Sequence, residues 1–170
     1  MRGIRPMVLT AGALALTLPA CSDGDDGVSK AGRAPRGDVR VCELLTRGEV
    51  AAAVGNPVAD GSDEVGVRLC DWASVTDGTS VSVSLLVGPD EQLCVDALAM
   101  DPANEKVVGF DVPTYWSYLD IQGGFGNIVA CTDAGQLTLT VTGALDGETD
   151  EARLREAAEN LAARAIDRLE

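Results

Sequence analysis

Histidine is absent from the 170-residue sequence. Without it, the chain cannot form a Ser-His-Asp triad, a Cys-His nucleophile pair or an imidazole-ligated metal site. The S-x-x-K motif of penicillin-binding proteins and the phosphate-binding motif G-x-x-x-x-G-K-S/T do not occur either. We therefore predict a non-enzymatic protein that uses no metal and no cofactor.

Carboxylates are the catalytic groups that these absences leave open, because a glycoside hydrolase needs only two of them. Asp111, Asp120 and Asp133 flank the aromatic segment and are the strongest candidates. A chain with 27 acidic residues carries many surface carboxylates in any case. An Asp/Glu-dependent hydrolase is therefore the weakest of the functional hypotheses that we consider.

Basic residues are scarce, with 13 lysines and arginines against 27 acidic residues and a formal net charge of −14. Only Arg2 and Arg5 precede residue 21 and no acidic residue does, so the remainder carries 11 basic and 27 acidic residues, a net charge of −16. Nucleic acids and anionic lipid surfaces bind clustered lysine and arginine, and we expect neither as a partner. The acidity indicates either solubility or a basic partner.

The chain also lacks a run of about 20 apolar residues, the length that a membrane-spanning helix needs. Residues 1–6 are cationic and residues 7–20 carry no charge, which is typical of a secretory signal peptide. Leu-Pro-Ala-Cys at 18–21 resembles the lipobox of bacterial lipoproteins, which implies lipid transfer to the Cys21 thiol and cleavage before it. We predict a signal peptide at 1–20 and a protein anchored through Cys21 at the extracytoplasmic face of the cell membrane.

Four cysteines remain after Cys21, and an even number in an exported domain indicates disulfides. They are Cys42, Cys70, Cys94 and Cys131. Four cysteines allow three connectivities, and the sequence alone does not choose among them. We favour Cys42–Cys70 and Cys94–Cys131, because each pair would tie a helix, or the segment before it, to a strand in the same half. A four-cysteine zinc site is the alternative, but no C-x2-C spacing occurs.

Residues 21–40 are polar and rich in glycine, which predicts a flexible tether before a single domain at 41–170. Thr46 and Glu49 have the spacing of a capping box and predict a helix that ends at Gly55. A second helix is expected from Glu91 to about Met100 after Asp90. Its apolar side would comprise Leu93, Cys94, Ala97 and Leu98. A long helix capped by Thr149 or Asp150 is expected to reach about Leu169 and to cover the apolar face of a sheet.

Alternation of apolar and polar residues predicts the strands of that sheet. It occurs at 65–70, 81–87, 106–110, 114–121, 126–131 and 136–142. Short turns between strands favour antiparallel pairing, and we write the order as α-β-β-α-β-β-β-α. The prediction is an α+β fold, an antiparallel sheet of about five strands covered by the long C-terminal helix and two shorter helices.

Aromatic residues are few, and five of the six fall within 16 residues. These five are Phe110, Tyr115, Trp116, Tyr118 and Phe125. On a strand, Trp116 and Tyr118 share one face and Tyr115 takes the other. We expect one set to enter the core, and the other to form a binding surface beside serines and threonines. The alternative is that all of them pack in the core.

Three landmarks together carry a resemblance to a known family. They are Cys-Glu-Leu-Leu-Thr-x-x-Glu-Val at 42–50, Cys-Asp-Trp at 70–72 and a closing helix rich in Ala, Arg and Leu. With the lipobox and tether, residues 40–170 resemble the domain-of-unknown-function 3558 lipoproteins of actinobacteria. The resemblance implies a cell-envelope lipoprotein and a Cys42–Cys70 disulfide, and it implies no catalytic residue.

The leading hypothesis is a non-enzymatic binding or interaction module that recognises an envelope protein or glycan. A secreted-type inhibitor of an envelope enzyme is the main alternative, since small disulfide-bonded α+β domains suit that use. Tyr115, Trp116 and Tyr118 are the predicted binding surface under the first hypothesis.

Overall fold

A computed structural model describes residues 39–63, 68–87, 90–121, 123–143 and 150–169. The predicted signal peptide and Cys21 lie outside these residues. The strands are β1 (Ser62–Asp63), β2 (Leu69–Ala73), β3 (Ser80–Leu86), β4 (Glu105–Val107), β5 (Thr114–Leu119), β6 (Phe125–Thr132) and β7 (Gly135–Thr142). The helices are η1 (Val41–Glu43), α1 (Arg47–Val54), α2 (Glu91–Ala99) and α3 (Glu151–Asp167). The α+β class is confirmed.

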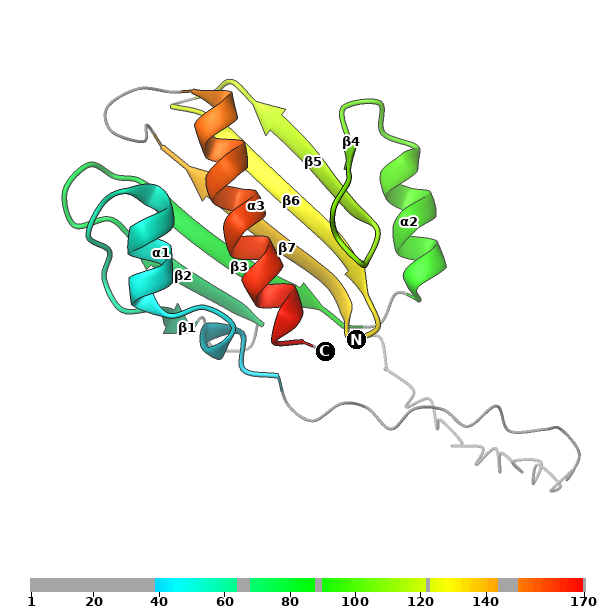
Figure 1. The fold of residues 1–170 in the computed structure, drawn as a ribbon, viewed down its shortest axis with the longest axis horizontal. Helices are drawn as coiled ribbons and strands as arrows, with labels where there is room; N and C mark the ends of the chain where they lie inside the picture. Colours follow the sequence, from blue (N-terminus) through cyan, green and yellow to red (C-terminus); the bar gives the residue numbers. More distant parts are fainter. Residues whose placement is uncertain (1–38, 64–67, 88–89, 122, 144–149, 170) are drawn as a thin grey trace, which may run out of the picture. The chain divides into compact units, whose positions relative to one another are not determined.

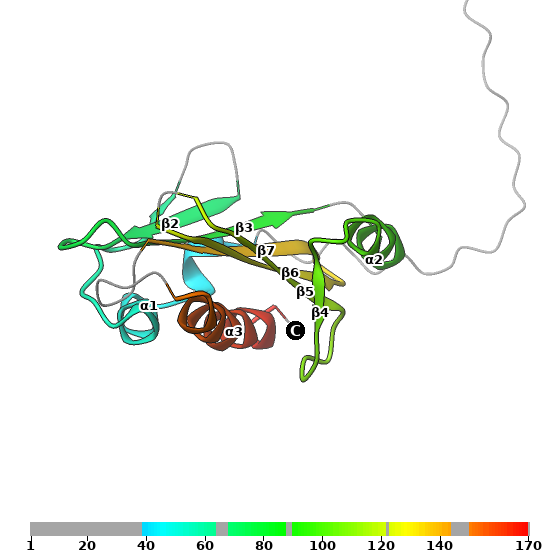
Figure 2. The same cartoon turned by 90° about the horizontal axis from the view of Figure 1, so that it is seen from above.

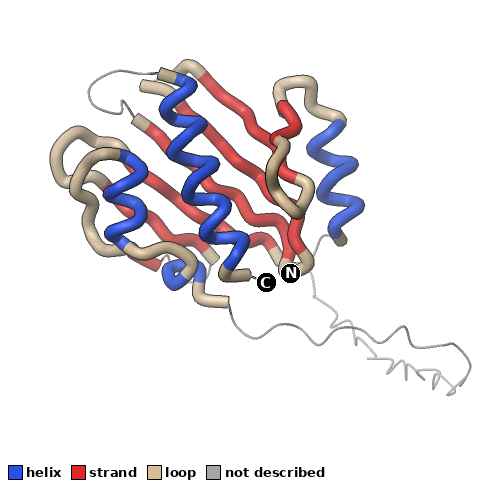
Figure 3. Tube along the Cα trace, in the orientation of Figure 1, coloured by secondary structure: helices blue, strands red, loops and turns tan. Residues whose placement is uncertain are grey.

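All seven strands form one antiparallel sheet in the order β1-β2-β3-β7-β6-β5-β4 (Figures 1 and 3). The predicted count of about five was low. It omitted the two-residue strand β1. The predicted order also counted only three strands after the second helix, although the sequence has four alternating segments there and all four are strands. A strand of two residues such as β1 contains too few residues for an alternating pattern to be recognised.

The predicted helix boundaries rest on side chains that cap the first turn. Thr46 and Glu49 form both hydrogen bonds of a capping box at α1, and Gly55 ends the helix with a positive φ of 76°. Asp90 and Asp150 cap α2 and α3 by accepting backbone N–H groups of the following turn. These interactions are local, which explains why sequence alone located the helix starts.

The hydrophobic core lies between one face of the sheet and the layer formed by α1 and α3, below the sheet in Figure 2. Val83, Leu139 and Ile128 stand in register on β3, β7 and β6 and are fully buried. α3 packs along β6 and β7 and against α1. Its buried stripe comprises Leu154, Ala157, Ala158, Leu161, Ala162, Ala165 and Ile166. The long C-terminal helix therefore covers the apolar face, as predicted.

Helix α2 does not join that layer and lies beyond the right-hand end of the sheet in Figure 2. Cys94 is its only buried side chain, and Leu93 is 64% exposed. The predicted apolar side of this helix is therefore not packed against the core. Its contacts are with β6 and β7, where Cys94 bonds to Cys131.

Both favoured disulfides, Cys42–Cys70 and Cys94–Cys131, are confirmed. The first joins the segment before α1 to β2, where Trp72 lies buried on the same face of the sheet as Cys70. Gly61 lies against this pair, because a Cβ built there would be 2.7 Å from the Cys70 sulfur and 2.8 Å from Trp72 Nε1. Only glycine fits at that position without displacing the disulfide or the indole.

Candidate functional site

The predicted aromatic binding surface is not exposed in the fold. Trp116 is 2% exposed and belongs to the core, and Tyr115 on the opposite face of β5 is 7% exposed. Tyr118 is half-buried against the core. Tyr115 and Trp116 therefore cannot present a surface to a partner, and their role here is packing.

The space for Trp116 comes from a missing side chain on the neighbouring strand. A Cβ on Gly126 of β6 would collide with the far edge of the indole ring. The indole Nε1 donates to Glu151 Oε1 at 3.3 Å, at the start of α3. The guanidinium carbon of Arg155 lies 5.9 Å from the ring centroid, within the range of a cation–π contact. Sequence reasoning missed these partners because they lie on a helix remote in sequence.

Arg155 also joins α3 to the short edge strand β4. Two of its nitrogens donate to both carboxylate oxygens of Glu105, at 2.9 and 3.1 Å, and its Nε donates to Glu159 at 2.8 Å. These bonds raise the pKa of Arg155, and the same arginine lowers the pKa of Glu105. The arrangement holds the edge of the sheet against the helix, and all three guanidinium nitrogens of Arg155 are bonded within the domain.

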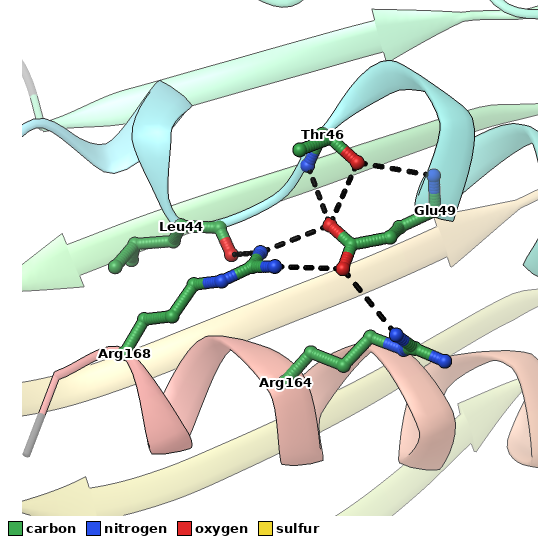
Figure 4. Close-up of polar contacts among 5 residues, drawn as sticks. All are labelled: Leu44, Thr46, Glu49, Arg164 and Arg168. Carbon is green, nitrogen blue, oxygen red and sulfur yellow. Dashed lines mark hydrogen bonds and ion pairs between the residues drawn. The ribbon is translucent and has the colours of Figure 1, made fainter.

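The carboxylate of Glu49 is the centre of a cluster of hydrogen bonds and ion pairs (Figure 4). Arg168 binds both of its oxygens at 2.7 and 2.9 Å, and Arg164 donates to Oε1 at 3.3 Å. The backbone N–H and hydroxyl of Thr46 donate to Oε2 at 2.8 Å each. Arg168 also donates to the carbonyl of Leu44 at 2.6 Å. The cluster therefore joins the start of α1 to the end of α3.

We call this cluster of Thr46, Glu49, Arg164 and Arg168 the clasp, because it holds two helices together. Its carboxylate does not act as a general acid or base. The hydrogen bonds from Arg168, followed by those from Thr46, hold the pKa of Glu49 far below its usual range. A carboxylate that stays ionised and accepts five donors has no proton to exchange near neutral pH. Glu49 is thus a structural residue, although the capping-box partner Thr46 supplies only two of the five donors to its carboxylate.

Two shallow hollows follow the sides of α1, with volumes of about 680 and 450 Å³. They share Gly48 and Ala52, so they lie on either side of the helix. In the larger, Arg47 and Asn56 are already bonded to Asp60 and Asp77. In the smaller, the polar groups include Glu49 and Arg164 of the clasp. Neither hollow presents a pair of carboxylates for hydrolysis.

The three carboxylates proposed for hydrolysis are all exposed and line neither hollow. Asp111 precedes the start of β5 and Asp120 follows its end, which places them roughly 20 Å apart at about 3.3 Å per residue. A glycosidase pair requires about 5–10 Å. Asp133 lies in the turn between β6 and β7, at the Asp111 end of the sheet. The fold therefore separates Asp120 from the other two, and Asp111 and Asp133 are exposed outside both hollows.

Potential metal ligands gather in one place among the described residues, where donor atoms of Cys42, Asp63 and Cys70 lie within 4.8 Å of one another. Both sulfurs are joined in the disulfide, so neither is a thiolate that could bind a metal. A zinc site using these cysteines is incompatible with the observed bond.

The face of the sheet opposite α1 and α3 is the strongest candidate for a binding surface. Its central row crosses five strands in register and is entirely polar, with Asp71, Ser82, Thr140, Asn127 and Ser117. These five side chains are half-buried, and no described helix covers the middle of the face (Figure 2). The row presents hydroxyl, amide and carboxylate groups at neighbouring positions.

Hydrogen bonds between neighbouring strands order this polar surface. Thr140 Oγ1 donates to Asn127 Oδ1 at 2.7 Å, and the hydroxyls of Ser80 and Thr142 lie 2.6 Å apart. Ser84 and Thr138 form the next pair along the same two strands. Alternation along β3 and β7 predicts that Ser82, Ser84, Thr138, Thr140 and Thr142 point outward, but only the strand order shows that they form one surface with Asn127.

Among the described residues, no helix combines the length and the apolar content needed to cross a membrane. Comparisons with family models, with curated proteins and with solved structures found no match to this chain.

Proposed function

We propose that this protein is a lipid-anchored lipoprotein of the cell envelope with a non-enzymatic binding function. The lipobox-like Leu-Pro-Ala-Cys at 18–21 supports the anchor, and two disulfides suit an oxidising compartment outside the cytoplasm. Membership of the domain-of-unknown-function 3558 lipoproteins fits the Cys42–Cys70 bond and the capping box at Thr46.

The in-register polar row on the open sheet face is the observation that carries the binding proposal. Ser82, Thr140 and Asn127 stand side by side on three strands, and serine hydroxyls and asparagine amides can both donate and accept hydrogen bonds. A polar outer face is ordinary on an antiparallel sheet, but here the row is unbroken across five strands and no described helix covers its middle, so it matches a ligand rich in hydroxyl groups. The binding site therefore lies on the sheet and not in the hollows beside α1.

The chemistry of this face favours a neutral glycan. Sugar hydroxyls are themselves both donors and acceptors, so they can pair with Ser, Thr and Asn side chains at strand spacing. The chain from Cys21 onward carries 11 basic and 27 acidic residues, a net charge of −16 that repels anionic polymers and nucleic acid. A neutral polysaccharide of the envelope is the partner that meets both conditions.

Affinity electrophoresis of the full chain through gels containing dextran, mannan or xylan tests the proposal. We expect retardation by at least one neutral polysaccharide and none by the anionic polymer alginate. Ser82→Ala combined with Thr138→Val should reduce the retardation several-fold, because both changes remove a hydroxyl and keep the shape. Thr76→Val, in the turn between β2 and β3, is the matched control.

Retardation by none of the neutral polymers, or equal loss in the Thr76→Val control, would reject the glycan-binding proposal. The anchor is tested separately by the mass of the mature protein. We expect the mass of a chain that starts at Cys21 and carries lipid, and Cys21→Ser should yield neither lipid nor membrane retention. A wild-type mass without lipid would reject the anchor alone.

A further inference from the structure

The tip of the β5–β6 hairpin exposes three large apolar side chains. Leu119 and Phe125 are paired in register at the hairpin end and are 52% and 36% exposed. Ile121, in the turn, is 58% exposed. The Gly124 amide donates to the Ile121 carbonyl at 3.1 Å and closes the turn. Several exposed apolar residues gathered at one tip indicate a contact surface more strongly than isolated ones do.

Negative charge surrounds this apolar tip. Asp120 follows Leu119 in the chain, and Asp150 and Glu151 begin α3 beside Tyr118. Desolvation is the main cause that raises the pKa of the Tyr118 phenol, and these three carboxylates raise it further. All three are exposed to solvent. The surface therefore combines apolar side chains with an acidic border.

One cation near this border is engaged with other carboxylates. Arg155, one turn into α3, directs its nitrogens to Glu105 and Glu159. The tip also lies at the end of the sheet opposite η1, where the described chain begins (Figure 1).

We propose that the hairpin tip is a docking surface for a segment of a partner protein that combines apolar side chains with lysine or arginine. Burying Leu119, Ile121 and Phe125 would supply the affinity, and the acidic border would select a cationic segment and speed its approach. This surface adjoins the polar row on the open sheet face but consists of different side chains. It is therefore a second interaction site, independent of glycan binding.

Three synthetic peptides of equal length test the proposal on the full chain. One alternates leucine with lysine, one replaces leucine with serine, and one replaces lysine with glutamate. We expect the leucine–lysine peptide to bind at least tenfold more tightly than either of the others. Leu119→Ser and Phe125→Ser should each weaken binding of the leucine–lysine peptide about tenfold. Asp120→Asn should weaken this binding less and should reduce its dependence on salt concentration.

Val108→Ser is the matched control, since Val108 is 87% exposed in the segment between β4 and β5. Equal binding of the serine–lysine peptide would show that net charge alone attracts cations and would overturn the proposal. An equal loss of leucine–lysine peptide binding in the Val108→Ser variant would also overturn the proposal. Binding to phosphatidylcholine vesicles that Leu119→Ser abolishes would identify the tip as a membrane contact instead. Ser82→Ala with Thr138→Val should leave peptide binding unchanged, so the two proposals can fail separately.

Discussion

Arg168, near the end of the chain, binds both carboxylate oxygens of Glu49, which lies 119 residues earlier. The same carboxylate completes the capping box of α1 with Thr46. One side chain therefore stabilises a local helix start and also fixes the position of α3 relative to α1. The clasp makes the stability of the α-helical layer depend on a charge.

Replacing Glu49 with glutamine should lower the free energy of unfolding by about 2–3 kcal/mol. The amide retains the size of the side chain but loses the charge-assisted bonds to Arg168 and weakens the cap. Urea unfolding at neutral pH measures the difference. Glu43→Gln is the control, because the ion pair of Glu43 with Arg40 is exposed to solvent and its loss should change stability by less than about 0.5 kcal/mol. Equal effects of the two changes would contradict the clasp.

Stability should be flat from about pH 5 to 8 and fall in acid. No histidine is present to titrate in that range. Glu49 has a folded pKa below its ordinary value of 4.5, so its contribution is complete above that pH and is lost as the pH falls through the folded pKa. The lowered pKa of Asp77 acts in the same direction. Thermal unfolding from pH 2 to 8 measures the pH dependence of stability. The stability of Glu49→Gln should fall less steeply in acid than that of the wild type.

The same added methyl group should have opposite effects at two glycines. Gly126→Ala places a Cβ into the Trp116 ring and should cost about 1–3 kcal/mol. Gly48 lies in α1 with open space around its Cα, so Gly48→Ala should stabilise by about 0.5–1 kcal/mol. Denaturant midpoints of both variants provide the measurement. A neutral Gly126→Ala would show that Trp116 does not occupy this position.

Removing the Cys94–Cys131 disulfide should release α2 and leave the sheet folded. Cys94 is the only buried residue of this helix, so little else holds it. Hydrogen exchange of a Cys94→Ser, Cys131→Ser variant should show fast exchange in α2 and continued protection in β6 and β7. The stability cost should be about 2–4 kcal/mol. Retained protection in α2 would mean that contacts other than the disulfide hold the helix. A matched Cys42→Ser, Cys70→Ser variant should lose protection in β2 instead.

Features that depend on neighbouring residues could be predicted from the sequence. The Thr46–Glu49 capping box, the Gly55 helix stop and the Asp150 cap each act within one turn, so a short pattern contains all the participants. The alternation along β3 and β7 likewise determined which side chains share a face, because successive residues of a strand point in opposite directions. Cysteine parity indicated disulfides, but three pairings were open.

The tertiary structure decided everything that depends on which elements meet. Backbone hydrogen bonds between strands do not depend on the side chains, so nothing local places β7 between β3 and β6 or aligns Ser82 with Thr140. The burial of Trp116 required a glycine on β6 and a helix beginning 35 residues later. Local patterns thus determined the elements and their faces, and long-range packing decided which aromatic residues enter the core and which polar residues form the open surface.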